Sequence, residues 1–79
     1  MDNDPLRRYE RLDVIKDIFR AFPPFWYYKG NAAKEIANKY AQNEKIAVLY
    51  KAKALEDYRQ FDSLYRVNVR GRDRLVLRH

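Results

Sequence analysis

The chain has 79 residues, carries a net charge of +6 and contains no cysteine. Its length is that of one small domain, and the absence of cysteine excludes a disulfide framework and a metal site built on thiolates. Hydrophobic residues are 47% of the chain and aromatic residues 15%, which argues against disorder although the mean hydropathy is −0.78. No stretch approaches the roughly 18 apolar residues of a membrane span, so we expect one folded cytoplasmic domain with no membrane partner.

The first predicted helix covers about residues 5–22. Asp4 is suited to cap it, and Pro5 is suited to the first helical position. Pro23 and Pro24 are expected to end it. Apolar residues recur at the three- and four-residue spacing of a helix that packs one face on a core, and they are Tyr9, Leu12, Ile15, Ile18, Phe19 and Phe22. Formation of a homodimer through this helix is the alternative use of that face.

The aromatic run at residues 25–28 is predicted to be a short strand or extended segment. Alternation along a strand would bury about half of its rings in the core. The other rings, with Trp26 and Tyr27 as candidates, would be open to a partner protein or to unpaired bases, which stack on aromatic side chains.

Two further helices are expected at about 32–41 and 44–58, with Asn43 in the turn between them as the cap of the later one. On a helical projection, Ile46 and Leu49 fall on or beside the charged face of this later helix. Two interpretations remain open. Either the helix is rotated so that its first turn is buried, or the pair is exposed to a partner protein or to thymine methyl groups.

Residues 64–78 alternate between apolar and polar on both sides of Gly71, which predicts a β-hairpin. An odd-numbered loop is favoured because it sets the apolar residues of both strands on one face and the arginines on the other. Six arginines and two aspartates give residues 59–79 a net charge of +4. Because like charges across a strand ladder are destabilising, these arginines indicate an anionic partner.

The stretch 33–40 (AKEIANKY), followed by a short polar turn, a helix and an arginine-tipped hairpin, resembles a winged helix-turn-helix domain. Small basic proteins of this kind are similar to those encoded by archaeal viruses and plasmids. The resemblance implies an α+β fold over residues 1–79, with three helices, a short strand after the first helix and a C-terminal hairpin wing. It also implies a transcriptional regulator bound to double-stranded DNA, with the third helix in the major groove and the wing on phosphates or in the minor groove.

The candidate binding residues follow from these expected elements. The DNA contacts would be Arg66, Arg70, Arg72 and Arg74 on the wing, Lys45 and Lys53 on the third helix, and Lys34, Lys39 and Asn43 near the second helix. The alternative function is protein interaction through Ile46 and Leu49, and a third is single-strand binding through Trp26 and Tyr27. No phosphate loop, metal-ligand cluster or nucleophile–base pair is visible, and His79 is the only histidine. We therefore expect no enzymatic activity, no metal and no cofactor.

Overall fold

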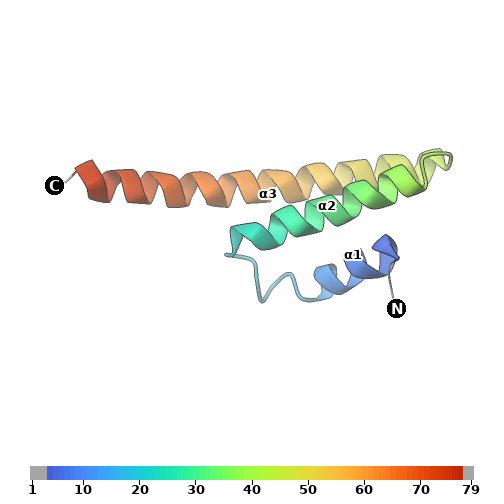
Figure 1. The fold of residues 1–79 in the computed structure, drawn as a ribbon, viewed down its shortest axis with the longest axis horizontal. Helices are drawn as coiled ribbons and strands as arrows, with labels where there is room; N and C mark the ends of the chain where they lie inside the picture. Colours follow the sequence, from blue (N-terminus) through green and yellow to red (C-terminus); the bar gives the residue numbers. More distant parts are fainter. Residues whose placement is uncertain (1–3, 78–79) are drawn as a thin grey trace.

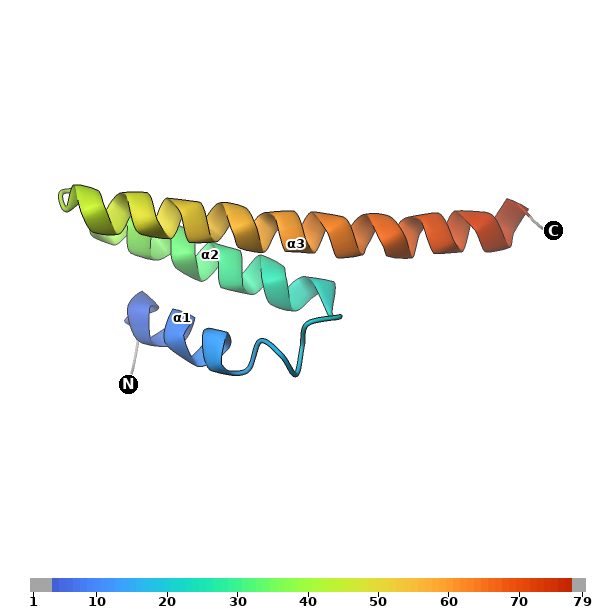
Figure 2. The same ribbon diagram turned by 180° about the vertical axis from the view of Figure 1, so that it is seen from behind.

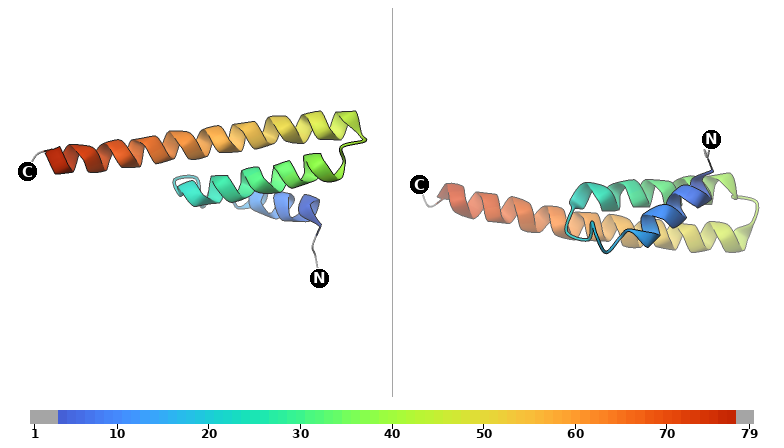
Figure 3. Two further views of the ribbon diagram at one scale, coloured as in Figure 1. Left: turned by 45° about the horizontal axis from the view of Figure 1, so that its top comes forward. Right: turned by 90° about the horizontal axis from the view of Figure 1, so that it is seen from below.

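The computed structural model describes the backbone of residues 4–77 and the side chains of residues 4–66. In this range the chain forms three helices and no strand (Figure 1): α1 (Pro5–Val14), α2 (Pro23–Lys39) and α3 (Glu44–Leu77). α2 packs against both α1 and α3. It runs antiparallel to α3, which continues alone beyond the start of α2 (Figures 1 and 2). Figure 3 shows that α1 crosses α2 at an angle and leaves the far half of α3 uncovered.

The expected first helix is shorter than predicted. The Asp4 carboxylate accepts from the amide of Leu6 at 3.1 Å, as the capping prediction requires, but α1 ends at Val14. Residues 15–22 form turns that lead into α2. Pro23 and Pro24 do not end a helix; they begin one, because the first helical positions need no backbone N–H partner and favour proline's fixed φ.

The expected strand at residues 25–28 is wrong, because these residues form the first turns of α2. Their rings lie on different sides of this helix. Phe25 is buried, the Trp26 indole N–H donates to the Arg20 carbonyl at 2.9 Å, and the Tyr27 ring meets residues of α3. A strand has two faces, whereas this helix directs consecutive rings to the 15–22 segment, to α3 and to solvent.

Gly30 lies inside α2, where it allows a close approach to α3. A Cβ atom at this position would lie 2.7 Å from Cε1 of Tyr58. The Tyr58 hydroxyl donates to Oδ1 of Asn31 at 2.5 Å, which holds the ring across α2. Glycine is therefore required here by packing rather than by a turn, although it costs about 1 kcal/mol of helix propensity relative to alanine.

The α+β fold with a C-terminal wing is wrong, because the backbone of residues 64–77 continues α3. Apolar and polar residues alternate over residues 65–70, but residues 75–77 after Gly71 are all apolar, and so short a pattern does not distinguish a strand from a helix. Arginine and leucine, which dominate this stretch, are good helix formers. Extending an existing helix adds one hydrogen bond per residue without a new nucleus, whereas an isolated two-stranded hairpin is marginal in water.

A small, alanine-rich core joins the helices. Its buried residues are Tyr9, Ala32, Ala33, Ile36 and Ala54. Ile46 packs against this core, whereas Leu49 is 51% exposed. Of the two interpretations of this pair, the rotated helix therefore holds for Ile46, and only Leu49 faces solvent. Within residues 4–77, no helix combines the length and the apolarity that a bilayer-spanning segment needs.

Candidate functional site

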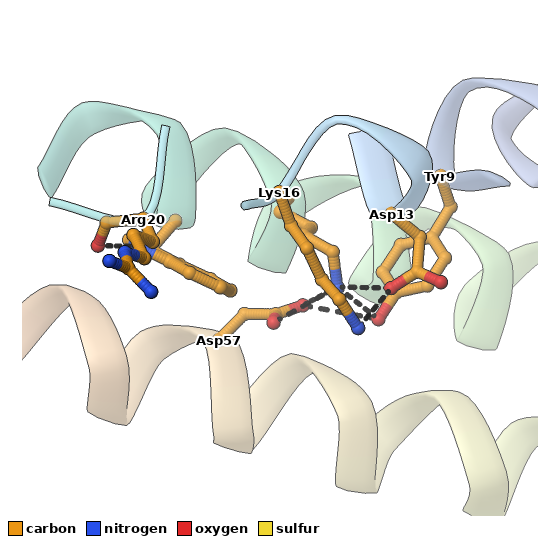
Figure 4. A network of polar contacts seen from close by, with 7 residues as sticks. Tyr9, Asp13, Lys16, Arg20 and Asp57 are labelled. Carbon is orange, nitrogen blue, oxygen red and sulfur yellow. Dashed lines mark hydrogen bonds and ion pairs between the residues drawn. The ribbon is translucent and has the colours of Figure 1, made fainter. Parts of the chain in front are cut away.

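A polar cluster lies where the three helices meet (Figure 4), and it consists of the buried Tyr9, Lys29 and Asp57 and the half-exposed Asp13. The Lys29 ammonium donates to the Tyr9 hydroxyl at 2.8 Å and to Oδ1 of Asp57 at 3.2 Å. The Tyr9 hydroxyl donates to Oδ2 of Asp57 at 3.3 Å, and Asp13 lies 3.4 Å from the ammonium. One lysine of α2 thus connects α1 to α3.

The electrostatics of the cluster follow from its burial. Burial raises the pKa of Asp57, and the Lys29 ammonium and the Tyr9 hydroxyl offset part of this rise. Burial also tends to raise the pKa of Asp13, but Lys29 and Lys16 together outweigh it and lower the pKa. Burial and the neighbouring Asp57 raise the pKa of Tyr9 far above the usual range of a tyrosine, so its hydroxyl stays protonated.

This cluster is satisfied by the protein itself. A polar hollow of about 490 Å³ adjoins it, lined by acids and lysines of all three helices. Among the described residues, no buried side-chain nitrogen or oxygen lacks a hydrogen-bond partner, and no group of three or more His, Asp or Glu could hold a metal ion. The buried polar atoms of the cluster are therefore paired with one another, and they join the three helices.

A second surface, the α2–α3 groove, is lined only by residues of those two helices. It has a volume of about 360 Å³ and is formed by Lys34, Ala37, Asn38, Lys51, Ala54, Leu55 and Tyr58. Both ionisable cations at the groove are lysines, and no carboxylate lines it. Leu55 is 58% exposed, although an apolar side chain gains free energy on burial. The groove thus differs from the polar hollow in being apolar and basic.

Aromatic side chains extend the α2–α3 groove towards the free half of α3. This aromatic row consists of Tyr27, Tyr58, Phe61 and Tyr65. The Tyr27 ring centroid lies 5.9 Å from that of Tyr58 and 5.4 Å from that of Phe61, and the Phe61 and Tyr65 rings stack with centroids 5.8 Å apart. Tyr27 lies between Tyr58 and Phe61 and Tyr65 ends the row, and these two rings are 50% and 55% exposed.

The structure separates the lysines that were expected to form one DNA-binding surface. Lys34 lines the α2–α3 groove, whereas Lys53 lines the polar hollow and lies 5.4 Å from the Tyr9 ring centroid. Lys45 is exposed in the first turn of α3. Lys34 and Lys53 therefore line different surfaces of the molecule.

Lys39 and Asn43, two further expected DNA contacts, have partners within the chain. The Lys39 ammonium lies 3.8 Å from the Asp4 carboxylate. Oδ1 of Asn43 accepts from the amide of Ile46 at 3.3 Å, so Asn43 caps α3 as its position in the sequence predicts. The hydrogen bond thus gives Asn43 a structural role at the start of α3.

The arginines assigned to the wing belong to α3. Arg66 is exposed, and its Nε atom lies 3.0 Å from Oδ2 of Asp62, one turn earlier. The backbone at Arg70, Arg72 and Arg74 is helical, and their side chains lie outside the described residues. These charges are therefore carried by a helix and not by the predicted hairpin. They remain concentrated in one segment of the chain.

Sequence reasoning missed the polar cluster. Lys29 lies four residues after Phe25 and three or four before Ala32 and Ala33, so it occupies the buried stripe of α2. A lysine in such a stripe indicates a buried ion pair. This signal is visible only if a helix is predicted to begin at Pro23, because residues 25–28 were expected to form a strand.

No protein-family model matches the chain, and neither a curated protein sequence nor a solved structure matches it. The class of protein is thus defined by the described part of the molecule itself, which is a three-helix domain with a long, basic third helix. The free half of α3 and the neighbouring α2–α3 groove are the surfaces from which a function can be argued.

Proposed function

We propose that this protein binds nucleic acid and holds its phosphate backbone with the basic second half of α3. The observation that carries the proposal is that α3 continues past α2 as a single helix (Figure 1), in the segment where positive charge is concentrated. Residues 59–79 contain six arginines and two aspartates. Arginine binds phosphate with a planar fork of donors, and concentrated positive charge attracts polyanions.

Double-stranded DNA is a ligand under this proposal. An α-helix with its side chains is about 10–12 Å wide, and the major groove of B-DNA, about 12 Å wide, admits such a helix. A helix that stands clear of the rest of the molecule can approach a groove without a clash from α1 or α2. Transcriptional regulation is the function we expect from such binding.

The test is fluorescence anisotropy with a labelled 20-base-pair duplex at several salt concentrations. If four arginines each neutralise one phosphate, log K against log salt has a slope of about −3.6. The variant Arg70→Gln/Arg72→Gln/Arg74→Gln should weaken binding and reduce the slope by about 2.7, since each lost contact removes about 0.9.

A matched control removes three charges elsewhere, in Arg7→Gln/Lys16→Gln/Arg20→Gln, outside α3. This variant should bind within a few-fold of the unchanged protein. Circular dichroism at 222 nm verifies that both variants keep their helix content. Binding without salt dependence, or equal losses in the two triple variants, would show that the second half of α3 is not the contact.

Protein interaction is the second candidate function, and exposed apolar residues near the start of α3 favour it. Val48 is 60% and Leu49 51% exposed. Sedimentation velocity and gel shifts of Val48→Ser/Leu49→Ser discriminate the two functions. Loss of association with unchanged DNA binding would assign this surface to a protein contact.

A further inference from the structure

The aromatic row lies within the basic part of the molecule and is only partly used for packing. Tyr58 and Phe61 are half-buried in the seam between α2 and α3, where packing explains them. Tyr27 and Tyr65 are 50% and 55% exposed, although each is in ring contact with Phe61. Packing alone does not require Tyr27, within the row, and Tyr65, at its end, to remain half-exposed.

Positive charge accompanies these rings along α3. Tyr58 is followed by Arg59 and Tyr65 by Arg66, so the same Tyr-Arg pair recurs after seven residues, or about two helical turns. Both arginines are exposed. At the other side of Tyr58 the row joins the α2–α3 groove, whose charged lining residues are Lys34 and Lys51. Consecutive residues of a helix lie about 100° apart, so Arg59 and Arg66 flank the aromatic row, and Arg66 also lies 3.0 Å from Asp62.

We propose that the aromatic row is a stacking site for unpaired nucleobases, so that a strand with unpaired bases binds more tightly than a fully paired duplex. Every base has a face that can stack on a tyrosine or phenylalanine, and single-strand binders combine such rings with a positively charged groove for the backbone. In a duplex the base faces are already stacked on one another and are not accessible. The inference rests on the proposed nucleic-acid function and names the form of ligand that the row selects.

The occupant is an anion rather than a second copy of this chain. A symmetric dimer would bring the same patch against itself. The lining of the α2–α3 groove, which contains Lys34 and Lys51 and no carboxylate, would then face an identical lining. Like charges juxtaposed at an interface are unfavourable, whereas phosphates between the bases of a strand complement these lysines.

The experiment compares three labelled probes: the oligonucleotide dT12, a 12-residue abasic strand of the same charge, and a 12-base-pair duplex. Affinities are measured by anisotropy at one salt concentration, and U12 is added to compare RNA with DNA. We expect dT12 to bind at least about fivefold more tightly than the abasic strand, since each stacked base contributes measurably to affinity. The abasic strand reports the charge contacts alone.

The variants are Tyr27→Ala and Tyr65→Ala, because both side chains are exposed and their removal should spare the fold. Each is expected to weaken dT12 binding at least about fivefold and to leave the abasic strand unaffected. Tyr65→Phe should keep the affinity, since it keeps the ring. Tyr28→Ala is the matched control. Tyr28 lies on α2 next to Tyr27, is 70% exposed and does not belong to the aromatic row.

The outcomes separate the two proposals. If dT12 binds no better than the abasic strand, or if Tyr65→Ala behaves like Tyr28→Ala, the stacking site is refuted while nucleic-acid binding by the arginines stands. If none of the probes binds at low salt, both proposals fail. If Tyr65→Ala abolishes self-association in sedimentation velocity and leaves dT12 binding unchanged, the row is an interface between copies, and the stacking site is again refuted.

Discussion

Removal of the buried ammonium in Lys29→Met should strongly destabilise the fold. Lys29 and Asp57 are 4% and 6% exposed, and their charged atoms lie 3.2 Å apart. Loss of one partner of a buried ion pair costs about 3–5 kcal/mol, because the other charge is left unpaired. We expect a cost of about 3 kcal/mol at pH 7, at the low end of that range, since Tyr9 still donates to the Asp57 carboxylate.

The cost should depend on pH, because Asp57 can become neutral. Its pKa is raised by burial in the folded state, so its neutral form favours folding. That contribution is complete below the ordinary aspartate value of 3.8 and is lost as the pH rises through the raised pKa. Without Lys29 the pKa of Asp57 rises further, so lowering the pH from 7 towards 4 favours the protonated carboxyl, which is no longer an unpaired charge. The difference in unfolding free energy between Lys29→Met and the unchanged protein should therefore shrink markedly between pH 7 and pH 4.

Urea unfolding, followed by circular dichroism at 222 nm at both pH values, measures this difference. Lys16→Met is the control, because Lys16 is 45% exposed and lies 3.4 Å from Asp13, so its loss should cost less than about 1 kcal/mol. The double variant Lys29→Met/Asp57→Asn should recover stability at pH 7 by removing the unpaired charge. An equal cost of Lys29→Met at both pH values, or a cost no larger than that of Lys16→Met, would refute the reasoning.

Three further predictions concern single positions. Gly30→Ala should lower the unfolding free energy by about 1 kcal/mol, because overcrowding of Tyr58 outweighs the gain in helix propensity. In a Tyr58→Leu background the same change should be stabilising, and urea midpoints that move in the same direction in both backgrounds would contradict this. Burial raises the pKa of Tyr9, so its contribution to stability is lost as the pH rises above the usual tyrosine range. Urea midpoints between pH 9 and pH 11 should fall less in Tyr9→Phe than in the unchanged protein, and equal slopes would exclude the effect. Asn43→Ala should cost about 1 kcal/mol and Asn43→Asp much less, because Asn43 caps α3; equal urea midpoints for the two variants would contradict a capping role.

Local signals of helix ends could be predicted from the sequence, because a cap depends on a few neighbouring residues. Asp4 and Asn43 both accept the backbone hydrogen bonds expected of them. Proline is less decisive, since it is compatible with both the end of one helix and the start of the next. At Pro23 and Pro24 the second possibility holds, and the aromatic run that follows is therefore helical.

The long extent of α3 could not be predicted from local pattern. The residues on either side of Gly71 fit a strand and a helix almost equally well, and the decision depends on whether a helix already precedes them. The candidate arginines could be identified by composition alone, but the element that carries them could not. The aromatic row could not be predicted either, because Tyr27 belongs to α2 and its partners lie more than 30 residues later in α3.

The two faces of α3 explain why a buried ion pair and an open aromatic row can coexist in so small a protein. Asp57 and Tyr58 are neighbours in sequence, about 100° apart around the helix. Asp57 therefore meets Lys29 within the polar cluster, while Tyr58 meets Gly30 and Asn31 at the edge of the α2–α3 groove. The ion pair sets the rotation of α3 against α2, because rotation in either direction would separate Asp57 from Lys29. Since Tyr58, Phe61 and Tyr65 belong to the same helix as Asp57, the buried cluster determines which of its rings α3 presents beside Tyr27.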